Sequence, residues 1–223
     1  MLIRCSCCQK ELVNNLTLRE LFFSNSQRCY HCEKLFSKID QATACPGCGR
    51  PSSLELCQDC KLWQQELGFV MENLSLFYYD DGFRQWIENY KFTGDYRLRG
   101  AFVMELTRIL QNYREYLICP LPLSKERFEQ RGFNQVCGCL DLTKVSYECL
   151  LVRSESPPQS EKSRGERLLM KQPFKLTVPK SEIRNQRVLL IDDVYTTGRT
   201  LFHAAELLYK NGAKSVRGLT FAR

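Results

Sequence analysis

Hydrophobic and polar residues follow two different patterns along the 223-residue chain, and the change comes at about Trp63. The segment before Trp63 is poor in aliphatic residues and rich in cysteine. After Trp63, short apolar runs alternate with segments whose apolar residues recur at helical spacing. Strands that alternate with helices are typical of an α/β domain with a mainly parallel sheet. We therefore divide the chain into a small module, residues 1–62, and an α/β domain, residues 63–223.

The secondary structure of the α/β domain can be assigned from these patterns. Strands are expected at Asn73–Tyr79, Tyr116–Pro122, Tyr147–Val152, Arg187–Ile191 and Ser215–Ala222. Helices are expected from Asp80-Asp81 to about Phe92, from Gly94-Asp95 to about Asn112, over Ser124–Gln130 and Phe133–Thr143, and around Leu201–Leu208 with an end at Gly212.

The most apolar of these segments, Val188–Ile191, predicts a strand that is buried on both faces of a parallel sheet. Four aromatic residues of the predicted helices are interpreted as core and helix-packing residues rather than as stacking platforms for bases. They are Tyr90, Phe92, Tyr96 and Phe102.

Composition narrows the class of protein. Hydrophobic residues make up 43% of the chain and charged residues 26%, as in a soluble globular protein. No apolar run approaches the roughly 18 residues that a membrane span needs. The first residues lack the apolar stretch of a secretory signal. We therefore expect a cytoplasmic protein with no integral membrane segment.

Nine of the 13 cysteines lie within the first 60 residues, and eight of these nine form four Cys-x-x-Cys pairs. Because a reducing compartment disfavours disulfides, this density indicates metal binding. Four pairs supply two complete sets of four thiolates with no open position, so we expect two structural zinc ions rather than a catalytic one. The expected ligands are Cys5, Cys8, Cys29, Cys32, Cys45, Cys48, Cys57 and Cys60.

The order of the four pairs leaves the pairing open. In the simplest arrangement the first two pairs bind one ion and the last two bind the other, but the spacing also permits a crossed arrangement. Residues 1–62 carry a formal charge of +2, from 8 basic and 6 acidic residues. Each ion with four thiolates contributes a charge of −2, so the loaded module would be acidic overall. We therefore interpret it as a metal-stabilised platform for protein contacts rather than as a DNA clamp.

The stretch Val188–Thr200 carries the strongest sign of a binding site. A buried strand is followed by Asp192-Asp193, a short turn rich in hydroxyl groups and glycine, and a helix. Backbone N–H groups at the helix start, together with threonine hydroxyls, can hold a phosphate. The two acids can accept hydrogen bonds from vicinal ribose hydroxyls or hold Mg²⁺ through water, and they are expected to lie outside the core. The residues concerned are Asp192, Asp193, Thr196, Thr197, Gly198, Arg199 and Thr200.

This stretch resembles the phosphoribosyl pyrophosphate (PRPP) motif of type I phosphoribosyltransferases. The resemblance implies that Asp192 and Asp193 bind the ribose hydroxyls and that the turn binds the 5′-phosphate. Many purine-salvage members have a third acid where this chain has Thr196. Its absence argues against hypoxanthine- or guanine-type chemistry.

A second stretch, Pro120–Gln135 with its Arg-Gly-Phe-Asn-Gln segment, is similar to the signature of the ComF family. The later residues Gln159 and Ser163–Arg167 belong to the same resemblance. Members of this family join a zinc ribbon to a phosphoribosyltransferase domain and act in natural transformation. The resemblance covers nearly the whole chain. It implies a type I phosphoribosyltransferase-like α/β fold with a mainly parallel sheet and flanking helices, preceded by a small double zinc ribbon.

Three basic residues of this second stretch, Lys125, Arg127 and Arg131, are candidates for contacting pyrophosphate, since arginine matches phosphate geometry. Without the motif, a solvated basic loop would be the preferred interpretation. Residues 120–187 carry a charge of +5, from 13 basic and 8 acidic residues, a modest attraction for phosphate or nucleic acid. The polar stretch Arg153–Glu166 occupies the position of a hood that closes over the substrate, although a surface linker is the rival interpretation.

Two functions are compatible with these features. The first is a competence protein that handles imported single-stranded DNA in the cytoplasm beside a ComFA-type DNA-translocating ATPase at the uptake machinery, with a pocket for PRPP or another ribose-phosphate. The second is a free-standing Mg²⁺-dependent, amidophosphoribosyltransferase-like enzyme that acts on a small nucleophile. A transcriptional regulator is less well supported, because no helix-turn-helix pattern precedes the domain. No catalytic residue is assigned, and turnover is left open.

Overall fold

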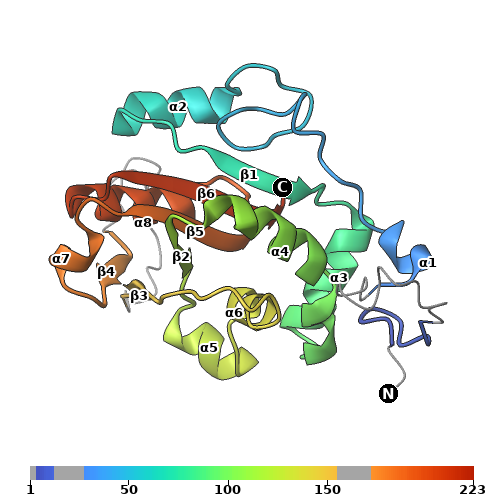
Figure 1. The fold of residues 1–223 in the computed structure, drawn as a ribbon. Coiled ribbons are helices and arrows are strands. Elements are labelled where there is room, and N and C mark those ends of the chain that lie inside the picture. Colours follow the sequence, from blue (N-terminus) through green and yellow to red (C-terminus); the bar gives the residue numbers. More distant parts are fainter. Residues whose placement is uncertain (1–3, 13–27, 155–171) are drawn as a thin grey trace, which may run out of the picture.

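The computed structural model describes residues 4–12, 28–154 and 172–223 of the chain. Its central element is a four-stranded parallel sheet in the order β1-β6-β5-β2 (Figure 1). These strands are β1 (Asn73–Phe77), β2 (Tyr116–Pro120), β5 (Arg187–Val194) and β6 (Ser215–Ala222). The prediction of an α/β fold with a mainly parallel sheet is confirmed.

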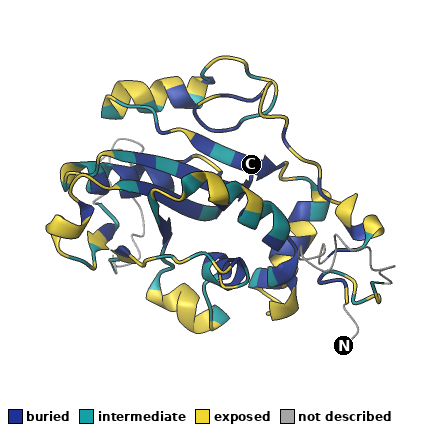
Figure 2. Cartoon of the chain, in the orientation of Figure 1, coloured by how far each residue is buried: buried dark blue, intermediate teal, exposed yellow. Residues whose placement is uncertain are grey.

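Strand β5 lies in the middle of the sheet and carries the candidate site at its end. It pairs with β2 from Arg187 to Ile191 and with β6 from Arg187 to Val194. Val188–Ile191 are fully buried, because helices or loops cover both faces (Figure 2). The strand extends three residues beyond the apolar run, so the two aspartates lie within it instead of following it, and Asp192 pairs with Thr220 of β6.

Helices cover both faces of the sheet: α3 (Asp81–Lys91), α4 (Val103–Leu110) and α6 (Gln135–Leu140) lie on one face, and α8 (Arg199–Lys210) lies on the other. A further helix, α5 (Lys125–Arg131), has no buried residue. Three of these helices begin with a side-chain cap: the side chains of Asp80, Ser124 and Asn134 accept hydrogen bonds from the first turns of α3, α5 and α6. One hydrophobic cluster contains residues from α3, α4 and α6, and a second contains residues from α8.

The single helix predicted from Gly94-Asp95 to Asn112 is wrong. The chain instead forms two 3₁₀ turns, η1 (Tyr96–Gly100) and η2 (Gln111–Tyr113), on either side of α4. Asp95 caps η1 by accepting a hydrogen bond from the backbone of Arg97. Gly100, a poor helix former, then ends this turn. The periodicity of the apolar residues indicated helical structure without showing the interruption.

The strand predicted at Tyr147–Val152 is also displaced. The structure has β3 at Leu151–Arg153, which pairs with β4 (Phe174–Leu176) in a separate antiparallel sheet. Neither β4 nor the short helix α7 (Lys180–Ile183) was predicted from the sequence. From residue 155 onward, the predicted hood Arg153–Glu166 lies outside the described residues.

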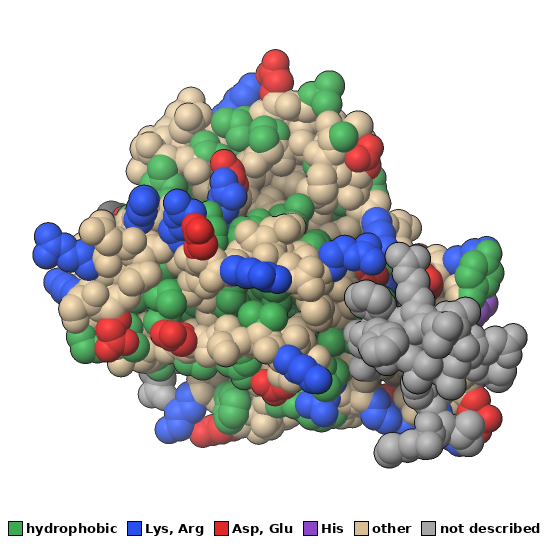
Figure 3. Space-filling view, in the orientation of Figure 1, with side chains coloured by type: hydrophobic (Ala, Val, Ile, Leu, Met, Phe, Trp, Pro, Cys, Tyr) green, Lys and Arg blue, Asp and Glu red, His purple; other side chains and the backbone are tan. Residues whose placement is uncertain are grey.

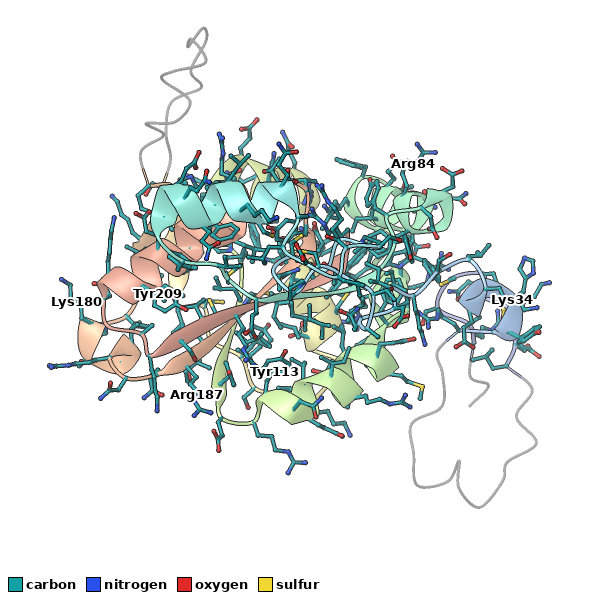
Figure 4. All side chains as sticks on the ribbon, turned by 90° about the horizontal axis from the view of Figure 1, so that it is seen from above. Lys34, Arg84, Tyr113, Lys180, Arg187 and Tyr209 are labelled. Atoms are coloured by element: carbon teal, nitrogen blue, oxygen red, sulfur yellow. The ribbon has the colours of Figure 1, made fainter. Side chains whose placement is uncertain are left out.

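The cysteine-rich segment contains two short helical elements, α1 (Tyr30–Glu33) and α2 (Gln58–Leu67). The proposed boundary after residue 62 falls within α2. Seen from above, α2 lies across α8 (Figure 4), and Trp63 of α2 stacks on Phe202 of α8 with ring centroids 4.6 Å apart. No helix in the described ranges is both long and apolar enough to cross a bilayer.

Candidate functional site

The eight cysteines of the four pairs form two groups in the structure. Cys5, Cys8, Cys29 and Cys32 make one group, and Cys45, Cys48, Cys57 and Cys60 make the other, with the sulfur atoms of each group within 4.8 Å of one another. This grouping is the sequential arrangement, not the crossed one. Cys7 and His31 belong to neither group.

The distances between sulfur atoms match a tetrahedral zinc site. Zinc–sulfur bonds of about 2.3 Å place two tetrahedral ligands about 3.8 Å apart, whereas a disulfide needs about 2.05 Å. The Sγ atoms of Cys8 and Cys29 are 3.7 Å apart, and those of Cys45 and Cys60 are 3.8 Å apart. Both tetrads could therefore hold a zinc ion.

Hydrogen bonds and charge favour one thiolate in each tetrad, whereas the pKa values of Cys32 and Cys57 are raised mainly by burial and that of Cys60 mainly by its hydrogen bond with Cys48. Burial alone would raise the pKa of Cys5, but hydrogen bonds from the backbone N–H groups of Cys8, Cys29 and Cys7 lower it to about 6. A hydrogen bond from Cys60 lowers the pKa of Cys48 to about 5 in spite of burial, and the charge of Arg223 adds to this effect. Lowered thiol pKa values suit metal ligands, which bind as thiolates.

The two tetrads differ in their surroundings. In the first, Cys8 is exposed and Cys29 is partly exposed. All four cysteines of the second are buried and pack in the same cluster as residues of β5 and α8. The hydroxyl of Ser75 on β1 donates a hydrogen bond to the backbone oxygen of Cys48 at 3.2 Å. The second tetrad is therefore part of the domain's core.

The two aspartates of β5 point to opposite faces of the sheet, as alternation along a strand requires. Asp193 lies on the same face as Leu189 and Ile191 and is only 5% exposed. The expectation that both acids lie outside the core is therefore wrong for Asp193. Asp192, on the other face, is half-buried.

Asp193 has two partners that the sequence pattern did not indicate. Lys91, the last residue of α3, places its Nζ 2.7 Å from Oδ2 of Asp193. Gln135, the first residue of α6, donates a hydrogen bond to the same oxygen. Gln135 belongs to the Arg-Gly-Phe-Asn-Gln segment, but nothing in the spacing of the sequence links it to Asp193.

The pKa of Asp192 is unusually high for a carboxyl group. Burial and the neighbouring charge of Asp193 raise its pKa to about 7, although the backbone N–H of Asp193 and the charges of Lys91 and Arg153 oppose the shift. A carboxyl group that titrates near neutral pH beside several cations is typical of a functional site. A bound cation or sugar hydroxyl would favour its ionised form.

A cavity of about 710 Å³ opens at the carboxyl end of β5, the usual place for ligands in parallel sheets. Its lining includes five basic and three acidic side chains. These are Lys91, Arg127, Arg131, Arg153 and Arg223, with Glu88, Asp192 and Asp193. The cavity therefore brings together two separate predictions, the aspartates and the basic residues Arg127 and Arg131. Lys125, at the start of α5, is not part of the lining.

The turn between β5 and α8 contains a residue in the left-handed backbone conformation that favours glycine. Gly198 has a φ of +78°, and a Cβ at this position would overlap the hydroxyl oxygen of Tyr195, so a larger residue would not fit. Thr196 and Thr200 line the cavity, whereas Thr197, Gly198 and Arg199 do not. The amino end of α8, which attracts anions, follows directly.

This turn also contacts two residues that lie near the second cysteine tetrad, Trp63 and Arg223. The indole Nε1 of Trp63 on α2 donates to the backbone oxygen of Thr197 at 2.9 Å. Arg223 donates to the oxygen of Thr196 at 3.2 Å and lies 4.4 Å from the centre of the Tyr195 ring. The same guanidinium lies 3.7 Å from Asp59, between Cys57 and Cys60. Neither Trp63 nor Arg223 was identified from the sequence, since these contacts join distant parts of the chain.

Comparison with known proteins gives a consistent picture. The phosphoribosyl transferase domain family matches residues 126–223. The competence protein ComFC of Streptococcus pneumoniae (strain ATCC BAA-255 / R6) is 35% identical over 228 residues, which cover 99% of this chain and 100% of that protein. ComFC of Bacillus subtilis (strain 168) is 34% identical, with coverage of 98% and 94%. Competence protein F of Haemophilus influenzae is 26% identical, with coverage of 88% and 96%.

Proposed function

The chain belongs to the ComFC family of competence proteins, and we propose that it handles imported single-stranded DNA in the cytoplasm during natural transformation, using the cavity at the end of β5 to bind PRPP or another ribose-phosphate group. One observation carries the proposal. Asp192, Arg127 and Arg131, predicted separately as sugar and phosphate ligands, line the same cavity. Acids for hydroxyl groups and arginines for phosphate are the two kinds of contact that a phosphosugar requires.

Each part of the ligand has a matching part of the cavity. The carboxylate of Asp192 would accept hydrogen bonds from sugar hydroxyls, while Asp193 is held by Lys91 and Gln135 and fixes the end of the strand. Thr196, Thr200 and the amino end of α8 would bind the 5′-phosphate. Arg127 and Arg131 would bind a pyrophosphate group. In this proposal Thr197, Gly198 and Arg199 shape the turn, and Lys125 adds positive charge at the start of α5.

A magnesium ion would accompany the ligand. Oxygen atoms of Asp192 and of the ligand's phosphates are the hard donors that Mg²⁺ prefers, often through water. The ion would neutralise part of the phosphate charge. The near-neutral pKa of Asp192 fits this role, because a nearby dication would favour the ionised carboxylate.

Two zinc ions would stabilise the cysteine-rich segment in this proposal. A tetrad of thiolates is a closed structural site, and zinc binding to such a site contributes directly to folding. The first tetrad, which is more exposed, would hold the amino-terminal part together. The second would fix α2 against the domain and, through α2, the turn that follows β5.

The DNA and partner contacts are proposed from the family and from charge. On the face shown in Figure 3, basic side chains are interspersed with acidic and uncharged ones rather than gathered in one band. The excess of basic over acidic side chains in the cavity therefore offers the more specific site for a nucleotide phosphate. We propose a ComFA-type DNA-translocating ATPase at the uptake machinery as the protein partner.

The experiment is a transformation assay in a naturally competent strain that carries only the variant chain. Asp192→Asn removes a charge at the cavity, and Asp81→Asn makes the same change at an exposed position at the start of α3. We expect the first variant to reduce transformation frequency at normal protein level and the second to leave it unchanged. Wild-type frequency with Asp192→Asn would contradict a role for the cavity.

A transferase that acts on a small nucleophile would use the same cavity but form a different product. Such an enzyme would release pyrophosphate from PRPP when supplied with its acceptor. Pyrophosphate release by purified wild-type protein, abolished by Asp192→Asn, would favour this alternative over a binding role.

A further inference from the structure

Phe92 is unusual among the aromatic residues of the α3 region. The side chains of Phe83, Trp86 and Tyr90 are buried and face the sheet, whereas Phe92 is 76% exposed. It follows Tyr90 by two positions, about 200° around a helix of 3.6 residues per turn, so its side chain points away from the core. The interpretation of Phe92 as a core residue is therefore wrong. Leaving such a side chain in water forgoes burial that usually stabilises a fold.

The exposed ring forms part of the cavity wall rather than a separate surface patch. Lys91, the adjacent residue, contacts Asp193 at 2.7 Å, and neighbouring Cα atoms are about 3.8 Å apart. A sugar held by Asp192 would occupy the same cavity as the ring, because both residues line it.

A planar cation stands next to the ring. The guanidinium of Arg131 lies 5.5 Å from the centre of Phe92, within the range of a cation–π interaction. Arg131 also donates to Oε1 of Gln135 at 3.0 Å, and Gln135 donates to Asp193. These contacts fix the guanidinium relative to the acids. An aromatic ring and an arginine side by side are the groups on which nucleobases stack.

We propose that Phe92 forms a stacking site for the nucleobase of a nucleotide whose sugar and phosphate occupy the cavity, with Arg131 holding the ring in place through its cation–π contact while it faces the phosphates. The site rests on the proposed ribose-phosphate pocket and extends it from a phosphosugar to a nucleotide, including the 3′-terminal nucleotide of a single strand, which has a free sugar hydroxyl. A cavity of about 710 Å³ lies within the range of pockets that hold ligands of this size. Stacking is tolerant of base identity, so the site would not require a particular sequence.

Calorimetry with ribose 5-phosphate, AMP and dAMP in the presence of Mg²⁺ tests this proposal. Base stacking contributes about 1–3 kcal/mol per base, so wild-type protein should bind AMP roughly 5- to 150-fold more tightly than ribose 5-phosphate. Phe92→Ala should remove this advantage and leave the affinity for ribose 5-phosphate unchanged. Phe92→Tyr should retain the advantage, because it keeps the aromatic face. dAMP measures how much of the remaining affinity depends on the 2′-hydroxyl.

Phe128→Ala is the matched control. Phe128 lies on α5, is also exposed and is not among the residues lining the cavity. Its truncation should change no affinity. Equal binding of AMP and ribose 5-phosphate by wild-type protein, or an AMP advantage that survives in Phe92→Ala, would overturn the stacking site while leaving the phosphosugar pocket intact. Failure of wild-type protein to bind any of the three ligands would overturn both.

Discussion

The contact between α2 and the turn after β5 predicts that the metal-binding segment helps to hold the wall of the cavity in place. Trp63→Phe keeps an aromatic ring that can stack on Phe202 but removes the indole N–H that donates to Thr197 at 2.9 Å. The turn would then lose one of the bonds that hold it in place. We expect weaker phosphosugar binding, because part of the binding free energy must then order the turn.

The expected size follows from the hydrogen bond that is lost. A bond between neutral groups contributes about 0.5–1.5 kcal/mol, which corresponds to a roughly 2- to 12-fold loss of affinity. The chain's other tryptophan supplies the control. Trp86 donates from its indole N–H to the backbone oxygen of Leu98 at 3.1 Å, within the core cluster of α3. Trp86→Phe removes a bond of the same kind away from the turn.

The assay is calorimetric titration of both variants with PRPP and Mg²⁺, with zinc content measured on the same samples. Trp63→Phe should bind more weakly than Trp86→Phe at equal zinc content. Because Trp86→Phe leaves Trp63 as the chain's only tryptophan, its fluorescence should also change as the ligand binds beside Thr197. Equal affinities for the two variants would refute the reasoning that α2 positions the turn.

The metal centres and the two aspartates give three more predictions. Elemental analysis should find two zinc ions per chain, and fewer than about one ion in fresh wild-type protein would contradict both metal centres. Cys48→Ser should lower the melting temperature more than Cys8→Ser, because the tetrad of Cys48 packs in the hydrophobic core and Cys8 is exposed. Lys91→Met should destabilise the fold by about 3 kcal/mol in urea denaturation by leaving the buried Asp193 without its cation, and adding Asp193→Asn to this variant should recover part of the loss. The folded-state pKa of Asp192 is raised to about 7, so the folded wild type loses stability as this carboxyl group ionises. The unfolding free energy of the wild type should therefore fall, relative to that of Asp192→Asn, as pH rises from about 4 through 7. Parallel stability curves for the two proteins would contradict that pKa.

The sequence predicted the parts of this molecule that depend on local pattern. The apolar run Val188–Ile191 indicated a buried central strand, and the four Cys-x-x-Cys pairs indicated two tetrads. The PRPP-like stretch and the basic loop were predicted separately, and Arg127 and Arg131 line the same cavity as Asp192 in the folded chain. The spacing of the pairs did not decide between sequential and crossed grouping, because both satisfy the same local turns.

The remaining features depend on contacts between distant segments. Lys91 ends an ordinary amphipathic helix, and its partner Asp193 lies about one hundred residues later. Arg223 is the last residue of the sequence, yet it contacts Thr196 and Asp59. Phe92 and Tyr90 are both aromatic residues near the end of a predicted helix, and the sequence does not distinguish them. Because α3 ends at Lys91, Tyr90 faces the core, whereas Phe92 is exposed and lines the cavity. Such pairings are set by tertiary packing, which periodicity does not report.

The central claim is that the cavity at the end of β5 binds a ribose-phosphate group through Asp192. The most direct test is calorimetric titration of wild-type protein and Asp192→Asn with PRPP and Mg²⁺, with Asp81→Asn as the control. Hydrogen bonds to a charged acceptor contribute about 1.5–3 kcal/mol, so Asp192→Asn should bind at least about tenfold more weakly, while Asp81→Asn should match the wild type. Equal affinity for wild type and Asp192→Asn, or no binding by folded wild-type protein at millimolar PRPP, would contradict the claim.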